Sequence, residues 1–206
     1  MTSQDFTSYD LYIFDCDGVI LDSNPLKSEA FYVSVLEFGH HKAEQFLEYH
    51  EQNRGISRYR KFEYFFTNIH VQANIEIGLY VDKYASLIAD GYFHSNITDG
   101  FLETIGSLAD KECYVVSGSD EYELKEVFKF KKLSLYFNAI YGSPYDKVRN
   151  INMHINYQHK KVLFIGDSQE DLRVSKAFNF DFLFVSGYCS IDLDVLETIT
   201  TFKELS

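Results

Sequence analysis

The sequence has little of several residues whose abundance would point to a class of protein. It contains two prolines, three cysteines and no tryptophan. So little proline excludes a proline-rich linker architecture. Cys16, Cys113 and Cys189 are far apart, and neither a C-x-x-C pair nor a cysteine–histidine zinc spacing occurs. We therefore expect neither a disulfide framework nor a structural zinc site, and a reducing, cytoplasmic location.

Positive charge and long apolar runs are also scarce. Lys and Arg total 19 against 31 Asp and Glu, which gives a net charge of −12. Such an acidic chain repels phosphate backbones and anionic lipids, so we expect no nucleic-acid and no membrane partner. No apolar run approaches the roughly 18 residues that a membrane span needs, and the polar, acidic first ten residues do not resemble a signal peptide.

Aromatic and apolar residues are abundant, and they cluster in short runs. Hydrophobic residues make up 46% of the 206, with 19 Phe and 16 Tyr, enough for a sizeable core. Buried strands are predicted at 9–15, 112–118, 160–167 and 180–187, and a weaker one at 137–142. Because these runs lack strict alternation, they favour a parallel sheet that is covered on both faces. Helical spacing between them predicts a Rossmann-like, doubly wound α/β fold.

The stretch 25–94 reads differently, because it shows helical spacing throughout and no convincing strand. About 70 residues are too many for an ordinary crossover between two strands. We therefore expect an inserted all-helical domain at 25–94, and a core built from 1–24 and 95–206. Loop-forming residues at 22–24 and 95–100 suit the two connections.

Acidic and hydroxyl side chains follow three of the predicted strands. In an open α/β sheet, ligands bind where the carboxyl ends of the strands meet. A single Asp after a strand is usually a turn former or a helix cap. Several acids at neighbouring strand ends repel one another and call for a hard divalent cation such as Mg²⁺. The residues expected to converge are Asp15, Asp17, Ser117, Asp167 and Asp171.

Four segments resemble, in order, the motifs of the haloacid dehalogenase (HAD) superfamily of phosphotransferases. FDCDGVILDS at 14–23 resembles the first motif and VVSGS at 115–119 the second. GSPYDK at 142–147 resembles the third, and FIGDSQED at 164–171 the fourth. The first and fourth are specific signatures, whereas the second and third gain weight from their order and spacing.

This resemblance implies a role for each matched residue. Asp15 would be the nucleophile that forms an aspartyl-phosphate, and Asp17 the general acid and base. Phosphate would be bound by Ser117, Gly118 and Lys147. Magnesium would be held by Asp15, the backbone carbonyl of Asp17, Asp167 and Asp171. Haloalkanoate dehalogenases lack the second Asp of the first motif, so the presence of Asp17 favours phosphoryl transfer over dehalogenation.

The insertion follows the first motif directly, as in the C1-type helical caps of this superfamily. Segment RGISRYRKF at 54–62 is similar to the cap loop of β-phosphoglucomutase and related sugar-phosphate phosphatases, and the chain as a whole resembles these and the phosphoglycolate phosphatases. The comparison implies substrate contacts from Arg54 and Arg58, although close basic residues alone indicate a solvated helix face. Lys27 stands where the mutases carry a histidine.

We therefore predict a magnesium-dependent phosphatase with a helical lid. Its substrate would be a small phosphate monoester, either a sugar phosphate or a phosphoglycolate-like compound. Two alternatives stay open at this stage: a phosphomutase that returns the phosphoryl group to a bisphosphate intermediate, and a non-catalytic phosphate-binding module. The sequence indicates no oligomeric state.

Overall fold

Six parallel strands form the central sheet, in the order β5-β4-β1-β6-β7-β8. The computed structural model describes residues 3–205. The strands are β1 (Leu11–Phe14), β4 (Glu112–Asp120), β5 (Ala139–Ser143), β6 (Val162–Gly166), β7 (Asp181–Val185) and β8 (Thr198–Ile199). Every residue of β1 and β6 is buried, because helices cover both faces of the sheet. The predicted α/β class with a parallel sheet is confirmed.

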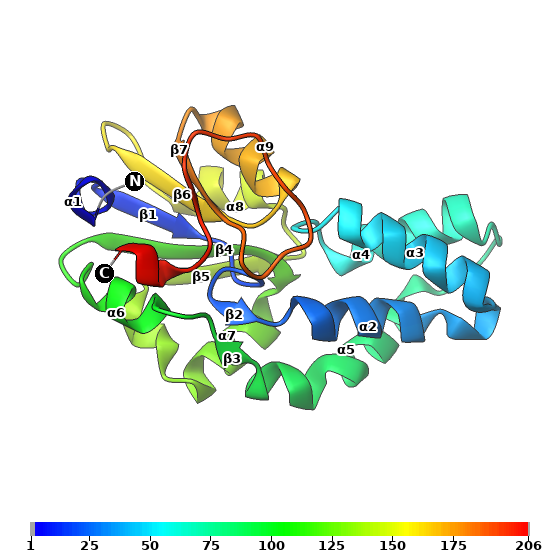
Figure 1. The fold of residues 1–206 in the computed structure, drawn as a ribbon. Helices are drawn as coiled ribbons and strands as arrows, with labels where there is room; N and C mark the ends of the chain where they lie inside the picture. Colours follow the sequence, from blue (N-terminus) through cyan, green and yellow to red (C-terminus); the bar gives the residue numbers. More distant parts are fainter. Residues whose placement is uncertain (1–2, 206) are drawn as a thin grey trace.

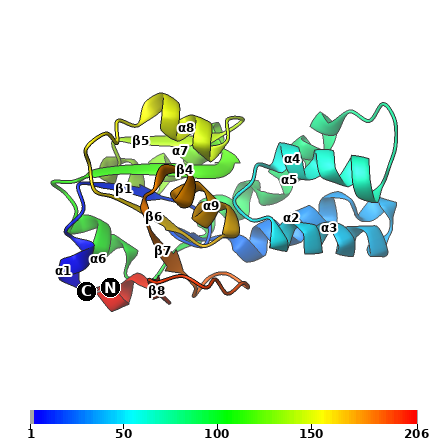
Figure 2. The same cartoon turned by 90° about the horizontal axis from the view of Figure 1, so that it is seen from above.

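Alternate residues of β1 face the two helical layers of the core. Tyr12 and Phe14 pack with the helices α6 and α7, whereas Leu11 and Ile13 pack with α8 and α9. The core helices are α1 (Ser3–Phe6), α6 (Phe101–Gly106), α7 (Glu121–Phe130), α8 (Lys147–His154) and α9 (Gln169–Phe178). Short 3-10 turns span Leu133–Tyr136 and Phe202–Leu205. Figure 1 shows the sheet between α8 and α9 on one side and α6 and α7 on the other, and Figure 2 looks down on the sheet.

Four further helices lie beyond one end of the sheet, as Figure 1 shows. They are α2 (Asn24–Ser34), α3 (His40–Gln52), α4 (Arg58–Tyr64) and α5 (Ile77–His94). A 3-10 turn at Leu36–Phe38 follows α2, and a π-helical turn at Phe65–Ile69 follows α4. The chain leaves the core through β2 (Leu21–Asp22) and returns through β3 (Asn96–Ile97), and these two strands pair antiparallel. We call residues 25–94 the cap.

Aromatic side chains fill the interior of the cap. The ring of Phe31 lies 5.5 Å from that of Phe46 and 4.2 Å from that of Tyr84, measured between centroids. Phe62 joins the same cluster. The many Phe and Tyr residues of the sequence therefore serve two cores, one on the sheet and one in the cap. Within residues 3–205, no helix has the length and apolar character that crossing a membrane requires.

Candidate active site

The loop after β1 turns sharply at the carboxyl end of the sheet. Asp15 directly follows the strand and is 3% exposed. Its Oδ1 accepts a hydrogen bond from the Cys16 N–H at 2.7 Å, and its Oδ2 lies 3.0 Å from Nζ of Lys147. Gly18 has a φ of +77°, and a Cβ there would lie 2.1 Å from Oδ2 of Asp167. The turn therefore requires glycine, and it holds Asp15 close to the end of β6.

Three carboxylates meet at this edge of the sheet. One oxygen from each of Asp15, Asp167 and Asp171 lies within 4.8 Å of the others, and all three residues are buried. Lys147 bridges two of them, because its Nζ is also 2.5 Å from Oδ1 of Asp171. Ser168 caps α9 and donates its N–H and its hydroxyl to Oδ2 of Asp171. Lys147, at the first position of α8, is thus fixed between the ends of β1 and β6.

The charges of this cluster perturb one another. Burial raises the pKa of Asp15, with further upward contributions from Asp171 and Asp17, while Lys147 opposes the rise. Burial likewise raises the pKa of Asp167 well above its ordinary value, and the charges of Asp15 and Asp171 add to the effect. These shifts mean that the protein groups alone leave negative charge uncompensated at this point.

A hard divalent cation fits these donors. Three buried carboxylates face one another with a single ammonium, that of Lys147, beside two of them. Carboxylate oxygens are the ligands that such cations prefer. Nδ2 of Asn24 donates to Oδ2 of Asp167 at 2.7 Å and orients that carboxylate, as outer-sphere partners of metal ligands commonly do. The side chain of Asp17 is not part of the group, and any contribution from this residue would come from its backbone carbonyl.

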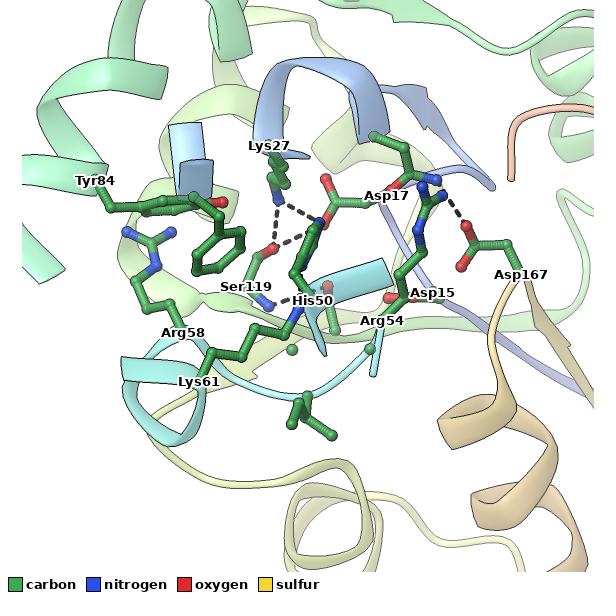
Figure 3. Close-up of a pocket in the computed structure, with 16 residues that line it drawn as sticks. Asp15, Asp17, Lys27, His50, Arg54, Arg58, Lys61, Tyr84, Ser119 and Asp167 are labelled. Carbon is green, nitrogen blue, oxygen red and sulfur yellow. Dashed lines mark hydrogen bonds and ion pairs between the residues drawn. The ribbon is translucent and has the colours of Figure 1, made fainter. Parts of the chain in front are cut away.

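The carboxylate of Asp17 faces the cap instead. Its Oδ2 lies 2.5 Å from Nζ of Lys27 and accepts the Ser119 hydroxyl at 2.7 Å, while its Oδ1 accepts the Ser23 hydroxyl at 2.6 Å. Burial raises the pKa of Asp17, but Lys27 and the two hydroxyls outweigh this and lower it to about 2. Figure 3 shows Lys27, Ser119 and Asp17 converging on one side of the pocket. Asp17 is therefore ionised while Lys27 is beside it.

The end of β4 supplies the second predicted motif. Ser117 is buried and its hydroxyl accepts the N–H of Ser119 at 3.3 Å. Gly118 passes close to the cap: a Cβ there would lie 2.3 Å from the carbonyl oxygen of Gly55. This contact joins the second motif to the loop before α4, so residues 25–94 pack against the end of β4 at this point.

A small pocket of about 40 Å³ lies between cap and core. Its lining combines core and cap residues: Asp15, Asp17, Asn24, Lys27, Phe31, His50, Arg54, Gly55, Ile56, Arg58, Lys61, Tyr84, Ser117, Gly118, Ser119 and Asp167. Lys147 and Asp171 are not among the residues that line the pocket, but Nζ of Lys147 lies 3.0 Å from Oδ2 of Asp15, which does line it. The structure thus brings nearly all the sequence-predicted residues to one pocket.

The three cap residues predicted from the sequence each have a different partner. Arg58 donates to both carboxylate oxygens of Glu123 on α7, and its guanidinium lies 4.7 Å from the ring centroid of Tyr84. Arg54 forms an ion pair with Glu51. Lys27 is bound to Asp17. All three are buried pocket residues rather than parts of a solvated helix face.

Sequence reasoning missed several pocket residues. From the sequence alone we predict His50 to be an exposed residue of a helix, and this prediction is wrong, because the residue is 4% exposed. The signal was available, because His50 follows Ala43 and Phe46 at helical spacing on one buried face of α3. Lys61 follows Arg58 by one turn of α4 and is also buried. Asn24 directly follows the first motif.

The comparisons with known proteins agree with this geometry. The sequence model of the haloacid dehalogenase-like hydrolases matches residues 12–185. The chain therefore belongs to the haloacid dehalogenase-like hydrolase family, and it is a hydrolase by that membership. No curated protein matches the chain.

Similar solved structures cover nearly the whole chain. One from Bacteroides fragilis, assigned to the same family, has a TM-score of 0.77 at 15% identity and covers 97% of this chain and 100% of its own. A protein from Lactobacillus plantarum, assigned as a phosphoglycolate phosphatase, has a TM-score of 0.71 at 16% identity and covers 100% and 98%. YfnB from Bacillus subtilis, a magnesium-bound HAD-type structure, has a TM-score of 0.68 at 18% identity and covers 96% of each chain. At these identities the likeness shows the shared fold.

Proposed function

We propose that this protein is a magnesium-dependent phosphatase that hydrolyses a small phosphate monoester through an aspartyl-phosphate on Asp15. The observation that carries the proposal is the pair of carboxylates after β1. Asp15 faces Lys147 and the acidic cluster, whereas Asp17 faces the pocket and Lys27. Two carboxylates in such different surroundings can divide the work of nucleophile and proton carrier.

In the first step, a carboxylate oxygen of Asp15 forms a bond to phosphorus as the bond to the leaving oxygen breaks. Lys147 is positioned to stabilise charge on that carboxylate and on the transferred group. The hydroxyl of Ser117 and the N–H of Gly118, near the end of β4, would bind phosphoryl oxygens. A magnesium ion held by Asp15, Asp167, Asp171 and the Asp17 carbonyl would supply positive charge that offsets repulsion between the nucleophile and the anionic ester.

Asp17 moves the proton in both steps. A phosphoryl dianion entering beside Asp17 adds negative charge and raises its pKa from the low value that Lys27 maintains. Asp17 can then give a proton to the leaving oxygen. In the second step its carboxylate takes a proton from the water that attacks phosphorus, which releases phosphate and restores the Asp15 carboxylate. Closure of the cap over a bound substrate would exclude bulk water and favour small metabolites over phosphoproteins.

The test is hydrolysis of p-nitrophenyl phosphate, with and without a chelator. We expect turnover that requires Mg²⁺ and falls by at least about 10³-fold in Asp15→Asn, while Asp194→Asn, at an exposed acid outside the pocket, keeps the wild-type rate. Equal rates for wild type and Asp15→Asn would overturn the assignment. Incubation with hexose phosphates separates a phosphatase, which releases phosphate, from a mutase, which forms an isomer.

The similar solved structures and the free cysteines support this proposal. The magnesium-bound YfnB and the Lactobacillus protein support the metal and the substrate class. Cys16 and Cys113 are free and buried, in keeping with the proposed cytoplasmic location.

A further inference from the structure

Positive side chains outnumber their partners on the cap side of the pocket. Lys27 faces Asp17, Arg58 faces Glu123, and Arg54 faces Glu51. Lys61 is different: it is 3% exposed, and no carboxylate of the described residues lies within ion-pair distance of its Nζ. Burying a cation without a counter-charge costs free energy, so such a residue is a candidate for a functional role.

The partner that Lys61 does have is neutral. Its Nζ lies 2.7 Å from Nδ1 of His50. Burial, followed by the charges of Lys61, Arg54 and Lys27, lowers the pKa of His50 well below its ordinary value, so the imidazole is uncharged. An ammonium has only donors, and Nδ1 must then accept. His50 thereby orients Lys61 without neutralising it.

A chain of hydrogen bonds fixes this arrangement. Nε2 of His50 lies 3.2 Å from the hydroxyl of Ser28, which donates to Glu51. Glu51 in turn accepts from Arg54 and, at 2.8 Å, from the hydroxyl of Ser190. These hydrogen bonds therefore connect Lys61 to Arg54, and both basic residues line the pocket, as Figure 3 shows.

Arg54 also has N–H donors that form no hydrogen bond with the described residues. Its Nε and Nη1 are buried and have no hydrogen-bond partner among the described residues. Buried donors are nearly always paired in native proteins. Two unpaired N–H groups beside an uncompensated ammonium form a site that lacks an anion.

We propose that Lys61 and Arg54 bind a second anionic group of the substrate, a carboxylate or a second phosphate carried by the leaving group. This inference rests on the proposed function, in which the scissile phosphate binds at Asp15 and Asp17, and these two residues line the same pocket. Because the two basic groups and the two acids line one pocket, we expect a short leaving group to join the two anions. A monoester whose leaving group is neutral leaves Lys61 and Arg54 uncompensated, so the site selects against it.

Lys61, rather than Arg58, is the specificity residue in this arrangement. The charge of Arg58 is already paired with that of Glu123 by the bidentate contact. The groups that face Lys61 support the same conclusion: burial, together with the charges of Lys27 and Arg54, lowers its pKa from 10.5 to about 7, because the acids Asp17 and Glu51 only partly oppose these effects. A bound anion would restore the charge of Lys61.

The experiment compares matched pairs of substrates. One arm measures kcat/KM for 2-phosphoglycolate against ethyl phosphate, and the other for 1,3-propanediol bisphosphate against propyl phosphate. Wild type should favour the anionic member of at least one pair about tenfold or more, and the arm that shows the preference identifies carboxylate or phosphate. A charge-assisted hydrogen bond of about 1.5–3 kcal/mol corresponds to roughly a 10- to 100-fold preference.

Variants test whether Lys61 causes the preference for the anionic substrate. Lys61→Met should lower the ratio of the two kcat/KM values about tenfold, and Lys61→Arg should retain more of it. Lys42→Met is the matched control, because Nζ of Lys42 lies 2.8 Å from Nδ1 of His70 in the cap but outside the pocket; it should leave the ratio unchanged. An equal loss on both members of a pair would show a structural role and overturn the inference.

The two proposals fail in different ways. If wild type hydrolyses ethyl and propyl phosphate as well as their anionic partners, the phosphatase assignment stands and the second-anion site is wrong. If no ester is hydrolysed, the phosphatase assignment fails. Calorimetry of 2-phosphoglycolate and ethyl phosphate binding to wild type and Lys61→Met then decides the inference, and equal affinities in the two proteins would refute it.

Discussion

Arg58 of the cap and Glu123 of the core form a bidentate ion pair that spans the closed lid. Nη1 of Arg58 lies 2.7 Å from Oε1 of Glu123, and Nη2 contacts Oε2. Arg58 is buried, while the side chain of Glu123 is 26% exposed. Because α4 and α7 belong to different parts of the fold, this pair stabilises the closed arrangement directly.

Glu123→Gln should weaken that closure. The variant leaves a buried guanidinium with a neutral partner, and the partial exposure of position 123 limits the cost to about 1–2 kcal/mol. Thermal melts should show a Tm roughly 2–8 °C lower than that of wild type, and KM should rise more than kcat falls. Glu126→Gln, on the same helix but outside the pair, should change neither. An unaltered KM in Glu123→Gln would contradict this role for the pair.

The contact between Gly118 and Gly55 leads to a second prediction. A methyl group at position 118 would lie 2.3 Å from the Gly55 carbonyl oxygen, so Gly118→Ala must displace the loop before α4. Misplacement of a substrate-binding loop by about 1 Å can cost up to roughly 10²-fold in kcat/KM, and we expect a loss of about 10- to 100-fold. Gly106→Ala, where an added Cβ meets nothing within 4 Å, should retain full activity. Comparable activities for the two variants would show that the close approach is not needed.

Much of the core was predictable because its signals are local. The strand before Asp15 is a continuous apolar run, and Ser168 precedes a first turn rich in acids, so each element can be read from neighbouring residues. The convergence of Asp15 and Asp167 follows from parallel strands whose carboxyl ends share one edge. These features need no knowledge of distant contacts.

The burial and pairing of side chains in the cap were harder to predict from the sequence, because they depend on residues that are far apart along the chain. Whether a basic residue on a helix is solvated or buried depends on what packs against it. Lys61 and Arg58 lie on one buried face of α4, yet only one of them meets a carboxylate, Glu123, which is supplied from far along the chain. The burial of His50 could have been inferred from the face it shares with Phe46, but its pairing with Lys61 could not.

The burial of Lys61 should make the folded protein less stable at neutral pH than at alkaline pH. Its pKa falls from 10.5 to about 7 on folding, so the unfolded chain binds more protons between these values and stability rises with pH across that window. Lys61→Met removes the cost and should stabilise the protein at pH 7 by about 1–4 kcal/mol, and less at pH 10. Denaturant unfolding at both pH values measures this.

The matched variant Lys42→Met should show no comparable pH-dependent gain, because Lys42 is only partly buried. A Lys61→Met variant that is destabilised at both pH values would mean that Lys61 is already compensated in the folded protein.

Metal binding should appear as a thermal shift that depends on Asp167. At a Mg²⁺ concentration of 100 times its Kd, binding stabilises the folded state by about 2.7 kcal/mol. Asp167→Asn removes one of three mutually repelling carboxylates, so the variant should be at least as stable as wild type without metal and should lose most of the Mg²⁺-induced rise in Tm. Asp194→Asn should keep the full rise. An undiminished rise in Asp167→Asn would place the cation elsewhere.

The central claim is that Asp15 is the nucleophile, and acid-quenched mass spectrometry of the wild-type protein tests it most directly. The protein is mixed with Mg²⁺ and p-nitrophenyl phosphate, quenched during turnover, digested and sequenced. The account predicts one phosphoryl group on the peptide that contains Asp15, placed on that residue by fragmentation and absent in Asp15→Asn. A phosphoryl group on any other residue, or sustained turnover by Asp15→Asn, would contradict it.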